Sequence, residues 1–291
     1  MWTIGSMSRT PVRQRAVAWP PMNVIRLTIA ALILSLGTTA FAARVDGTAV
    51  VEQMRAALET ERSSVRQIAF KVSGTGGIVT PVIVGEARGR VGDTTRILAV
   101  VLAPPGLRGM SYLIQHGAGD ANVQWLFVPI VGRVRKIVSP EAHSAFLNSD
   151  FTYADLGFVG TGSTFTLVGD GERDGVKCQL VQAVPKETWA YSRTVTCIAD
   201  DGHLPVDRQI YDGSNALWKV QKWSRPEMID GVPTILRMSM EDVQAKSRTD
   251  LEVSAVRYGL PVAESLFDPA HLGNAADAAI WTALDSGSAP N

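Results

Sequence analysis

Cysteine and histidine are both scarce in this sequence. Its 291 residues include only two cysteines, Cys178 and Cys197, and four histidines. Structural zinc sites need several such ligands at close spacing, and disulfide-rich small folds need many more cysteines. The histidines are scattered and form no H-x-x-x-H pair. We therefore expect neither a metal site nor a cofactor.

An excess of charge of one sign is also absent. Lys+Arg and Asp+Glu both number 28, so the formal net charge is zero. Nucleic-acid-binding domains usually show a strongly basic balance, so a nucleic-acid partner is not expected. With 46% apolar and 19% charged residues, the chain is too apolar for disorder and large enough for a sizeable core. Composition thus predicts a globular protein and leaves its function open.

Catalytic motifs are missing as well. Residues 160–163 do not form the G-x-S-x-G turn of serine hydrolases, and they lack its strand-turn-helix context. The glycines at 74–77 lie between two strand patterns, which favours a hairpin turn over a phosphate loop. Residues 170–175 resemble a calcium loop but lack its ligand spacing, so we expect a turn between two strands there. We expect no catalytic residues and do not expect an enzyme.

The first 42 residues have the features of a secretory signal. Arg26 precedes an uncharged run, residues 27–43, and an A-x-A pattern ends at Ala42. The run is shorter than the roughly 20 residues of a membrane span, although an N-terminal anchor is the alternative. We predict a start at Met22, cleavage after Ala42 and a soluble periplasmic product. The remainder would be one domain, 43–272, followed by a flexible tail, 273–291.

One helix is followed by many strands. Val51, Met54 and Leu58 have helical spacing, which predicts a helix over 48–62 with Thr48 as its cap. After Ser64 the apolar pattern has a period of two, with turn residues between most segments. This predicts one large antiparallel sheet or barrel, with strands at 65–72, 78–91, 95–102, 110–116, 123–128, 133–138, 165–168, 176–184, 191–199, 206–211, 216–223, 234–242 and 250–257.

One of these strands is apolar on both faces. Residues 97–102 are continuously apolar, as in strands that are buried on both sides. The helix could cover one face. The other face would then meet either a second sheet or an apolar cavity for a ligand.

The two cysteines lie on neighbouring predicted strands. The midpoint between Cys178 and Cys197 falls in a plausible hairpin loop at 186–189, so the two residues would face each other directly. Both also lie on the apolar side of their strands. We favour a cross-strand disulfide over two buried thiols.

Residues 109–156 carry the most distinctive motifs. They contain Trp125-Leu126-Phe127-Val128-Pro129, Arg133-Val134-Arg135-Lys136-Ile137 and Phe146-Leu147-Asn148-Ser149-Asp150-Phe151-Thr152-Tyr153-Ala154-Asp155-Leu156. These segments closely resemble the LolA-like outer membrane lipoprotein-sorting protein family, in which Gly and Glu are usual at the positions of Asn148 and Ala154. Weaker likeness at 178–193 and 211–219 extends the resemblance to most of residues 48–272.

The resemblance implies a mainly β fold. It would be a strongly curved antiparallel sheet, or incomplete barrel, of about 10–12 strands covered by an N-terminal helix. Its apolar interior would hold acyl chains. Candidate lining residues lie on apolar strand faces, although each could instead belong to an ordinary core; they are Phe70, Leu98, Val100, Tyr112, Trp125, Phe127, Leu236, Met238 and Met240. Methionine suits an adaptable lining.

The motif also contains charged residues. Arg133 and Arg135 share one strand face, and we expect them to pair with Asp150 or Asp155 in the following loop. Alternatively, they contact an anionic head group or a partner. The neighbouring motif residues Pro129, Phe151 and Tyr153 are expected to be structural.

Two functions fit these features. The first is a periplasmic carrier, a monomer that moves lipid or lipoprotein acyl chains from an inner-membrane exporter to the outer membrane. The second is a lipid-sensing or accessory subunit that uses the same fold to report to a membrane partner. The sequence does not distinguish between them.

Overall fold

The computed structural model describes residues 45–74, 77–78, 81–92, 94–116, 122–137, 143–156 and 162–284. The predicted signal sequence and its cleavage site lie outside these residues. Within them, no helix combines the length and apolar character needed to cross a bilayer.

The described residues form one antiparallel sheet of thirteen longer strands and two short ones. The short strands are β1 (Val45–Asp46) and β3 (Gly77–Ile78). The longer strands of the first half are β2 (Ser64–Gly74), β4 (Val82–Val91), β5 (Thr94–Ala103), β6 (Ser111–His116), β7 (Asn122–Val128) and β8 (Arg133–Ile137). Those of the second half are β9 (Ser163–Arg173), β10 (Val176–Pro185), β11 (Arg193–Ala199), β12 (Pro205–Tyr211), β13 (Leu217–Ile229), β14 (Val232–Asp242) and β15 (Ser247–Tyr258).

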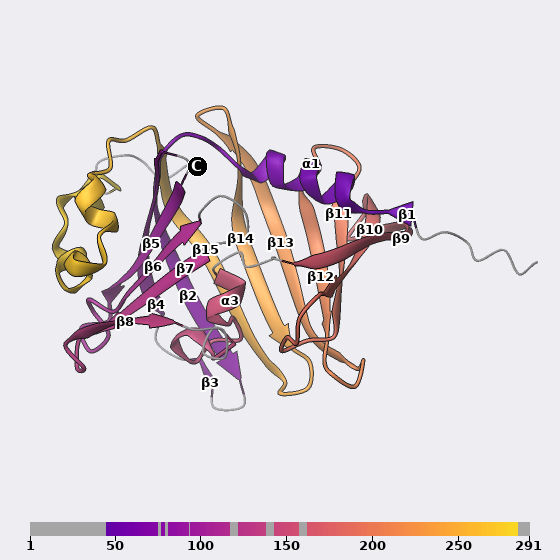
Figure 1. Ribbon diagram of the computed structural model, residues 1–291, viewed down its shortest axis with the longest axis horizontal. Coiled ribbons are helices and arrows are strands. Elements are labelled where there is room, and N and C mark those ends of the chain that lie inside the picture. Colours follow the sequence, from indigo (N-terminus) through magenta and orange to yellow (C-terminus); the bar gives the residue numbers. More distant parts are fainter. Residues whose placement is uncertain are drawn as a thin grey trace, which may run out of the picture. The chain divides into compact units, whose positions relative to one another are not determined.

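The strand order shows how the sheet is connected. It runs β1-β9-β10-β11-β12-β13-β14-β15-β2-β4-β5-β6-β7-β8, with β3 paired to β2 alone. Each half is therefore a run of consecutive hairpins, and the two halves meet where β15 pairs with β2. Figure 1 shows the strands curving around the short helix α3 (Tyr153–Leu156). The expected fold class, an unclosed and strongly curved antiparallel sheet, is confirmed.

The period-two pattern located the strands well but not all of their ends. Every predicted strand segment overlaps one of the thirteen longer strands, although 78–91 is divided between β3 and β4. The expected turn at 170–175 is shorter in the structure, because β9 continues to Arg173. The chain reverses at Asp174 and Gly175, whose φ angles of 50° and 82° are those of a tight hairpin turn.

The helix α1 (Thr48–Leu58) differs from its prediction at both ends. Its N-cap is Gly47, and the Asp46 carboxylate accepts the Thr48 N–H at 2.9 Å, so Thr48 is not the cap. The helix ends at Leu58, before the expected end at Arg62. Its buried Val50 and Val51 pack with Val181 and Ile198. It therefore lies on β10 and β11 and does not cover β5.

The C-terminal segment is folded where a flexible tail was expected. It forms three 3-10 helices, η2 (Glu264–Phe267), η3 (Pro269–Asp277) and η4 (Ala279–Leu284). Trp281 and Leu284 are buried at 7% and 3% exposure. The predicted tail 273–291 is thus packed as far as Leu284, and residues 285–291 lie outside the described part.

The disulfide joins two strands that are neighbours in the sheet. Cys178 on β10 bonds to Cys197 on β11, with a Cα–Cα distance of 5.4 Å. The sequence suggested that the two residues face each other directly, but in the structure they do not. Leu180 is the partner of Cys197 and Ala199 is the partner of Cys178, so the bond runs diagonally across the pair of strands.

Candidate functional site

The sheet has two apolar faces with different covers. We call the face that carries Ile68, Val84 and Tyr112 the inner face, and the face that carries Val65, Ala87 and Leu113 the outer face. Strand β5 contributes to both, since Ile97 and Val101 point inward while Leu98 and Val100 point outward. The sequence prediction that this strand is buried on both sides is confirmed.

The C-terminal segment covers the outer face. Phe267, Leu272, Trp281 and Leu284 pack there against the sheet. Two glycines of β4 let the aromatic rings approach the backbone, as glycines inside strands often do. A Cβ on Gly85 would lie 2.7 Å from the Trp281 ring, and one on Gly89 would lie 2.8 Å from Phe267.

A short segment between β8 and β9 covers the centre of the inner face, and α1 covers the part of that face that β9 to β11 form. We call residues 143–156 the inner segment; it contains η1 (Phe146–Asn148) and α3. Phe146, Phe151 and Tyr153 are buried in the inner cluster. Phe146 lies 5.7 Å from Phe70 and Tyr153 lies 5.2 Å from Tyr112, measured between ring centroids. The inner segment therefore occupies the centre of the curved sheet.

The inner segment is a tight turn. Ala145 and Thr152 form a β-bridge, and the Phe146 N–H donates to the Phe151 carbonyl at 2.8 Å. Leu147 and Asn148 between them have φ angles of 52° and 55°. Glycine adopts this left-handed conformation freely, and asparagine tolerates it better than most residues. This conformation accounts for asparagine at a position where the resembling family usually has glycine.

Two aspartates fasten the inner segment to the sheet. The Asp150 carboxylate accepts hydrogen bonds from Ser247 and, at 2.7 Å, from Thr249 on β15. The Lys219 ammonium donates to the Asp150 carbonyl at 2.6 Å. Asp155 pairs with Arg208 on β12 at 3.3 Å. The inner segment is thus held by strands of the second half of the sheet.

These partners correct the sequence prediction. Asp155 pairs with Arg208, and Asp150 with Ser247 and Thr249, rather than with Arg133 or Arg135. Both arginines are exposed on β8, at the edge of the described sheet. Proximity in sequence was misleading, because the curved sheet brings β12 and β15 closer to the inner segment.

A buried tyrosine links the inner segment to the first half of the sheet. The Tyr112 hydroxyl lies 2.6 Å from Gln124 Oε1 and 3.1 Å from the Tyr153 carbonyl oxygen. Burial, with a smaller contribution from Tyr153, raises the pKa of Tyr112 well above its ordinary value. The hydroxyl therefore stays protonated and serves as a hydrogen-bonding group.

The inner face also has a polar end. Arg66 on β2 lies 3.7 Å from Glu86 on β4 and donates to the Tyr258 hydroxyl at 3.3 Å. Arg88 follows on the same face of β4, and burial lowers its pKa despite the nearby Glu86 carboxylate. The Glu59 carboxylate also acts on Arg88, so the group holds both charges and is suited to a polar head group at the end of an apolar ligand.

The nine apolar candidates from the sequence are not brought together. Phe70, Tyr112, Met238 and Met240 belong to the inner cluster or pack against it, and Leu236 shares their face of β14. Leu98, Val100, Trp125 and Phe127 belong to the outer cluster, beneath the C-terminal segment. Alternation along β5 and β7 gives the two sets but does not show which set faces inward. The second set cannot line an inner cavity.

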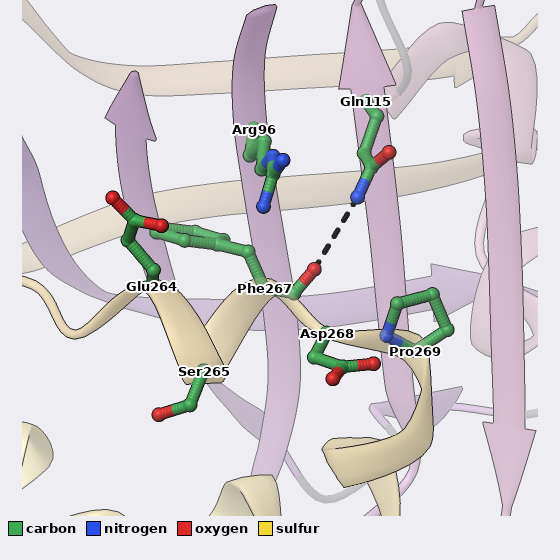
Figure 2. A pocket seen from close by; sticks show the side chains of 7 residues that line it. All are labelled: Arg96, Gln115, Glu264, Ser265, Phe267, Asp268 and Pro269. Atoms are coloured by element: carbon green, nitrogen blue, oxygen red, sulfur yellow. Dashed lines mark hydrogen bonds between the residues drawn. The ribbon is translucent and has the colours of Figure 1, made fainter. Parts of the chain in front are cut away.

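Two hollows in the described part of the chain are polar. One, of about 380 Å³, lies where η2 meets β5 and β6. Figure 2 shows Arg96 and Gln115 reaching from the strands toward this helix, with Gln115 donating to the Phe267 carbonyl at 3.3 Å. The other, of about 400 Å³, lies beside the β14–β15 hairpin. Neither suits an acyl chain, and the inner segment fills the place where the sequence predicts an apolar cavity.

Comparisons with known proteins agree with the fold. A family model described as "Uncharacterized protein" matches residues 93–274. None of the curated proteins compared with the chain matches it. An outer membrane lipoprotein-sorting protein domain from Vibrio parahaemolyticus superposes with a TM-score of 0.71 at 20% identity, over 77% of this chain and 97% of that one.

Two further solved structures are similar. A DUF1329 family protein from Desulfovibrio piger has a TM-score of 0.71 at 22% identity, covering 78% of this chain and 99% of its own. A LolA superfamily protein from Nitrosomonas europaea has a TM-score of 0.60 at 16% identity, covering 77% and 98%. The chain belongs to the family whose model matches residues 93–274, and its fold is LolA-like, that of the outer membrane lipoprotein-sorting proteins.

Proposed function

We propose that this protein is a periplasmic carrier that binds the acyl chains of a lipid or lipoprotein on the inner face of its sheet. It would take this cargo from inner-membrane machinery and deliver it toward the outer membrane. One observation carries the proposal: the apolar inner cluster, built from both halves of a curved sheet, is covered by a short inserted segment, while α1 covers the part of the same face that β9 to β11 form. The LolA-like fold of the chain supports this interpretation.

Cargo would replace the inner segment. Phe146, Phe151 and Tyr153 contribute apolar surface that an acyl chain can also provide. Each buried CH₂ contributes about 0.8 kcal/mol, so a long chain compensates for the lost side-chain contacts. Exchange of one apolar cover for another is then nearly balanced, which a carrier needs in order to release its cargo.

The polar contacts of the inner segment would set this balance. Asp150 and Asp155 keep the segment in place through Thr249 and Arg208 when no cargo is bound. A polar head group could lie at the Arg66, Glu86 and Arg88 end of the inner face. The proposed cargo is therefore an amphiphile with apolar chains and a polar head.

Lipid analysis tests the proposal directly. Mass spectrometry of the mature protein purified from periplasm should find acyl-chain lipids bound to it. A fluorescent fatty-acid probe should bind the lipid-free protein and be displaced by these lipids. Protein that neither retains lipid nor binds the probe would contradict the proposal.

A matched pair of variants locates the site. Met238 is partly buried against the inner cluster, and Met238→Asp would place an unpaired charge beside the acyl chain, which is strongly unfavourable. We expect probe binding to fall at least about tenfold. Val168→Asp, at a half-exposed position of β9, should leave probe binding unchanged. Circular dichroism checks that both variants fold; equal probe binding by the two would argue against the inner face.

A further inference from the structure

The turn between β7 and β8 exposes two apolar side chains. Ile130 is 95% exposed and Val131 is 52% exposed. The turn is closed by backbone hydrogen bonds, since the Val131 and Gly132 N–H groups donate to the Val128 carbonyl at 2.9 and 3.1 Å. Gly132 has a φ of 65°, which glycine adopts without strain. The backbone thus presents Ile130 and Val131 outward instead of folding them against the sheet.

The adjacent turn adds a third apolar side chain. The β5–β6 turn lies at the same end of the sheet, because Ser111 at the start of β6 pairs with Phe127 near the end of β7. A Cβ on Gly109 would lie 3.5 Å from Pro129 Cγ, so the two turns are in contact. Leu107 in the first turn is 38% exposed. We call Leu107, Ile130 and Val131 the apolar tip.

The strands around the apolar tip carry positive charge only, and Asp277 of the C-terminal segment pairs with Arg108 beside Leu107 at 3.0 Å. Residues 94–116 and 122–137, which contain β5 to β8, include no aspartate or glutamate. Arg133, Arg135 and Lys136 follow the tip directly and are exposed on β8. The whole chain, by contrast, has equal numbers of acidic and basic residues. These three cations therefore lie on β8 beside the apolar tip, and Figure 1 shows the place of β8 in the sheet.

We propose that the apolar tip and these three cations dock the protein on a bilayer that contains anionic lipids. Exposed apolar side chains that enter the interfacial region, flanked by Lys or Arg near anionic head groups, are a recognised mode of reversible membrane binding. The tip is a projecting turn rather than a groove, which suits a lipid surface. Its charge complements anionic head groups. The docking site is separate from the inner face and goes beyond the proposed carrier function.

Vesicle co-sedimentation tests the docking site. The mature protein should sediment with vesicles of phosphatidylcholine mixed with phosphatidylglycerol, and less with phosphatidylcholine alone. Raised salt should weaken the binding, because it screens the head-group charges. The double variant Ile130→Ser with Val131→Ser should bind the mixed vesicles about tenfold more weakly. Arg133→Gln with Lys136→Gln should remove the preference for anionic vesicles.

Two control variants separate docking from folding and from cargo binding. Val168→Ser with Val184→Ser changes two exposed valines on β9 and β10 and should leave vesicle binding unchanged. Met238→Asp should lose the fatty-acid probe yet still sediment with vesicles. Absence of binding to the mixed vesicles, or equal binding by the Ile130→Ser, Val131→Ser variant and the parent, would overturn the docking site. Either result would leave the carrier proposal standing.

Discussion

The two faces of this sheet are both apolar, yet their covers differ in kind. On the outer face, the rings of Phe267 and Trp281 lie directly on the glycines of β4, and the covering segment runs through three short helices. Over the inner cluster, the cover is one tight turn fastened by charged and hydroxyl groups, and α1 lies on the same face over β9 to β11. Close apolar packing favours a permanent cover. A small cover held by polar bonds can be exchanged.

Loss of Trp281 tests the permanent cover and should have the largest effect. Trp281→Ala removes a ring that is 7% exposed and leaves a cavity above Gly85. We expect the free energy of unfolding to fall by about 3–5 kcal/mol. Urea denaturation measures this change. Probe binding at low denaturant should stay at the parental level, and a gain in probe binding would mean that the outer face also accepts lipid.

Removal of the disulfide shows how a loss of stability affects lipid binding when neither covering segment is changed. Cys178 and Cys197 are 19 residues apart in sequence. Replacing both with alanine should lower the free energy of unfolding by about 3 kcal/mol. Fatty-acid probe binding should not change, because neither cysteine belongs to the inner cluster. Thiol titration of the unreduced parent gives the control; two free thiols would contradict the disulfide.

Truncation of Phe151 tests the exchangeable cover. Phe151 is 1% exposed, so in a rigid core its loss would cost about as much as the loss of Trp281. If the inner segment can open locally, the cost cannot exceed the free energy of that opening. We expect Phe151→Ala to lower the free energy of unfolding by less than half as much as Trp281→Ala. Probe affinity should rise. Equal losses in the two variants would show that the inner cover is as permanent as the outer one.

The smallest expected effect concerns one hydroxyl. Thr249 is fully buried and exchanges two hydrogen bonds with Asp150, at 2.7 and 2.9 Å. Thr249→Val should lower stability by about 1 kcal/mol and speed uptake of the probe in stopped-flow mixing. Thr166→Val, at a buried position on the opposite face of β9, is the matched control and should leave the uptake rate unchanged. If Thr249→Val leaves the rate of probe uptake unchanged, the Asp150 contacts do not control the exchange of the inner segment for cargo.

Much of the sheet could be predicted because a strand leaves a local signal. Alternation of apolar and polar residues depends only on neighbours two positions apart, so strands such as β2 and β15 were recognisable. Alternation does not identify the inward side when both sides are apolar. Leu98 and Phe127 were therefore assigned to the cavity although they face outward.

The covers were harder to predict because their partners are distant in sequence. Asp150 bonds to Thr249 across 99 residues, and Asp155 bonds to Arg208 across 53. The C-terminal segment forms 3-10 helices, which lack the 3.6-residue period that predicts an α-helix. One signal was available. Gly85 and Gly89 interrupt an otherwise regular strand pattern, and such glycines indicate that another group approaches the backbone.

The pairing of β2 with β15 has a consequence for folding kinetics. The hairpins within each half connect neighbouring strands, so their loops are short and can close early. The pairing of Ser64 with Tyr258 instead closes a loop that contains nearly the whole sheet. Long-range closure has a large entropic cost and slows folding. Joining of the two completed halves along β2 and β15 should therefore be the rate-limiting step of folding, and both faces acquire their final curvature only after it.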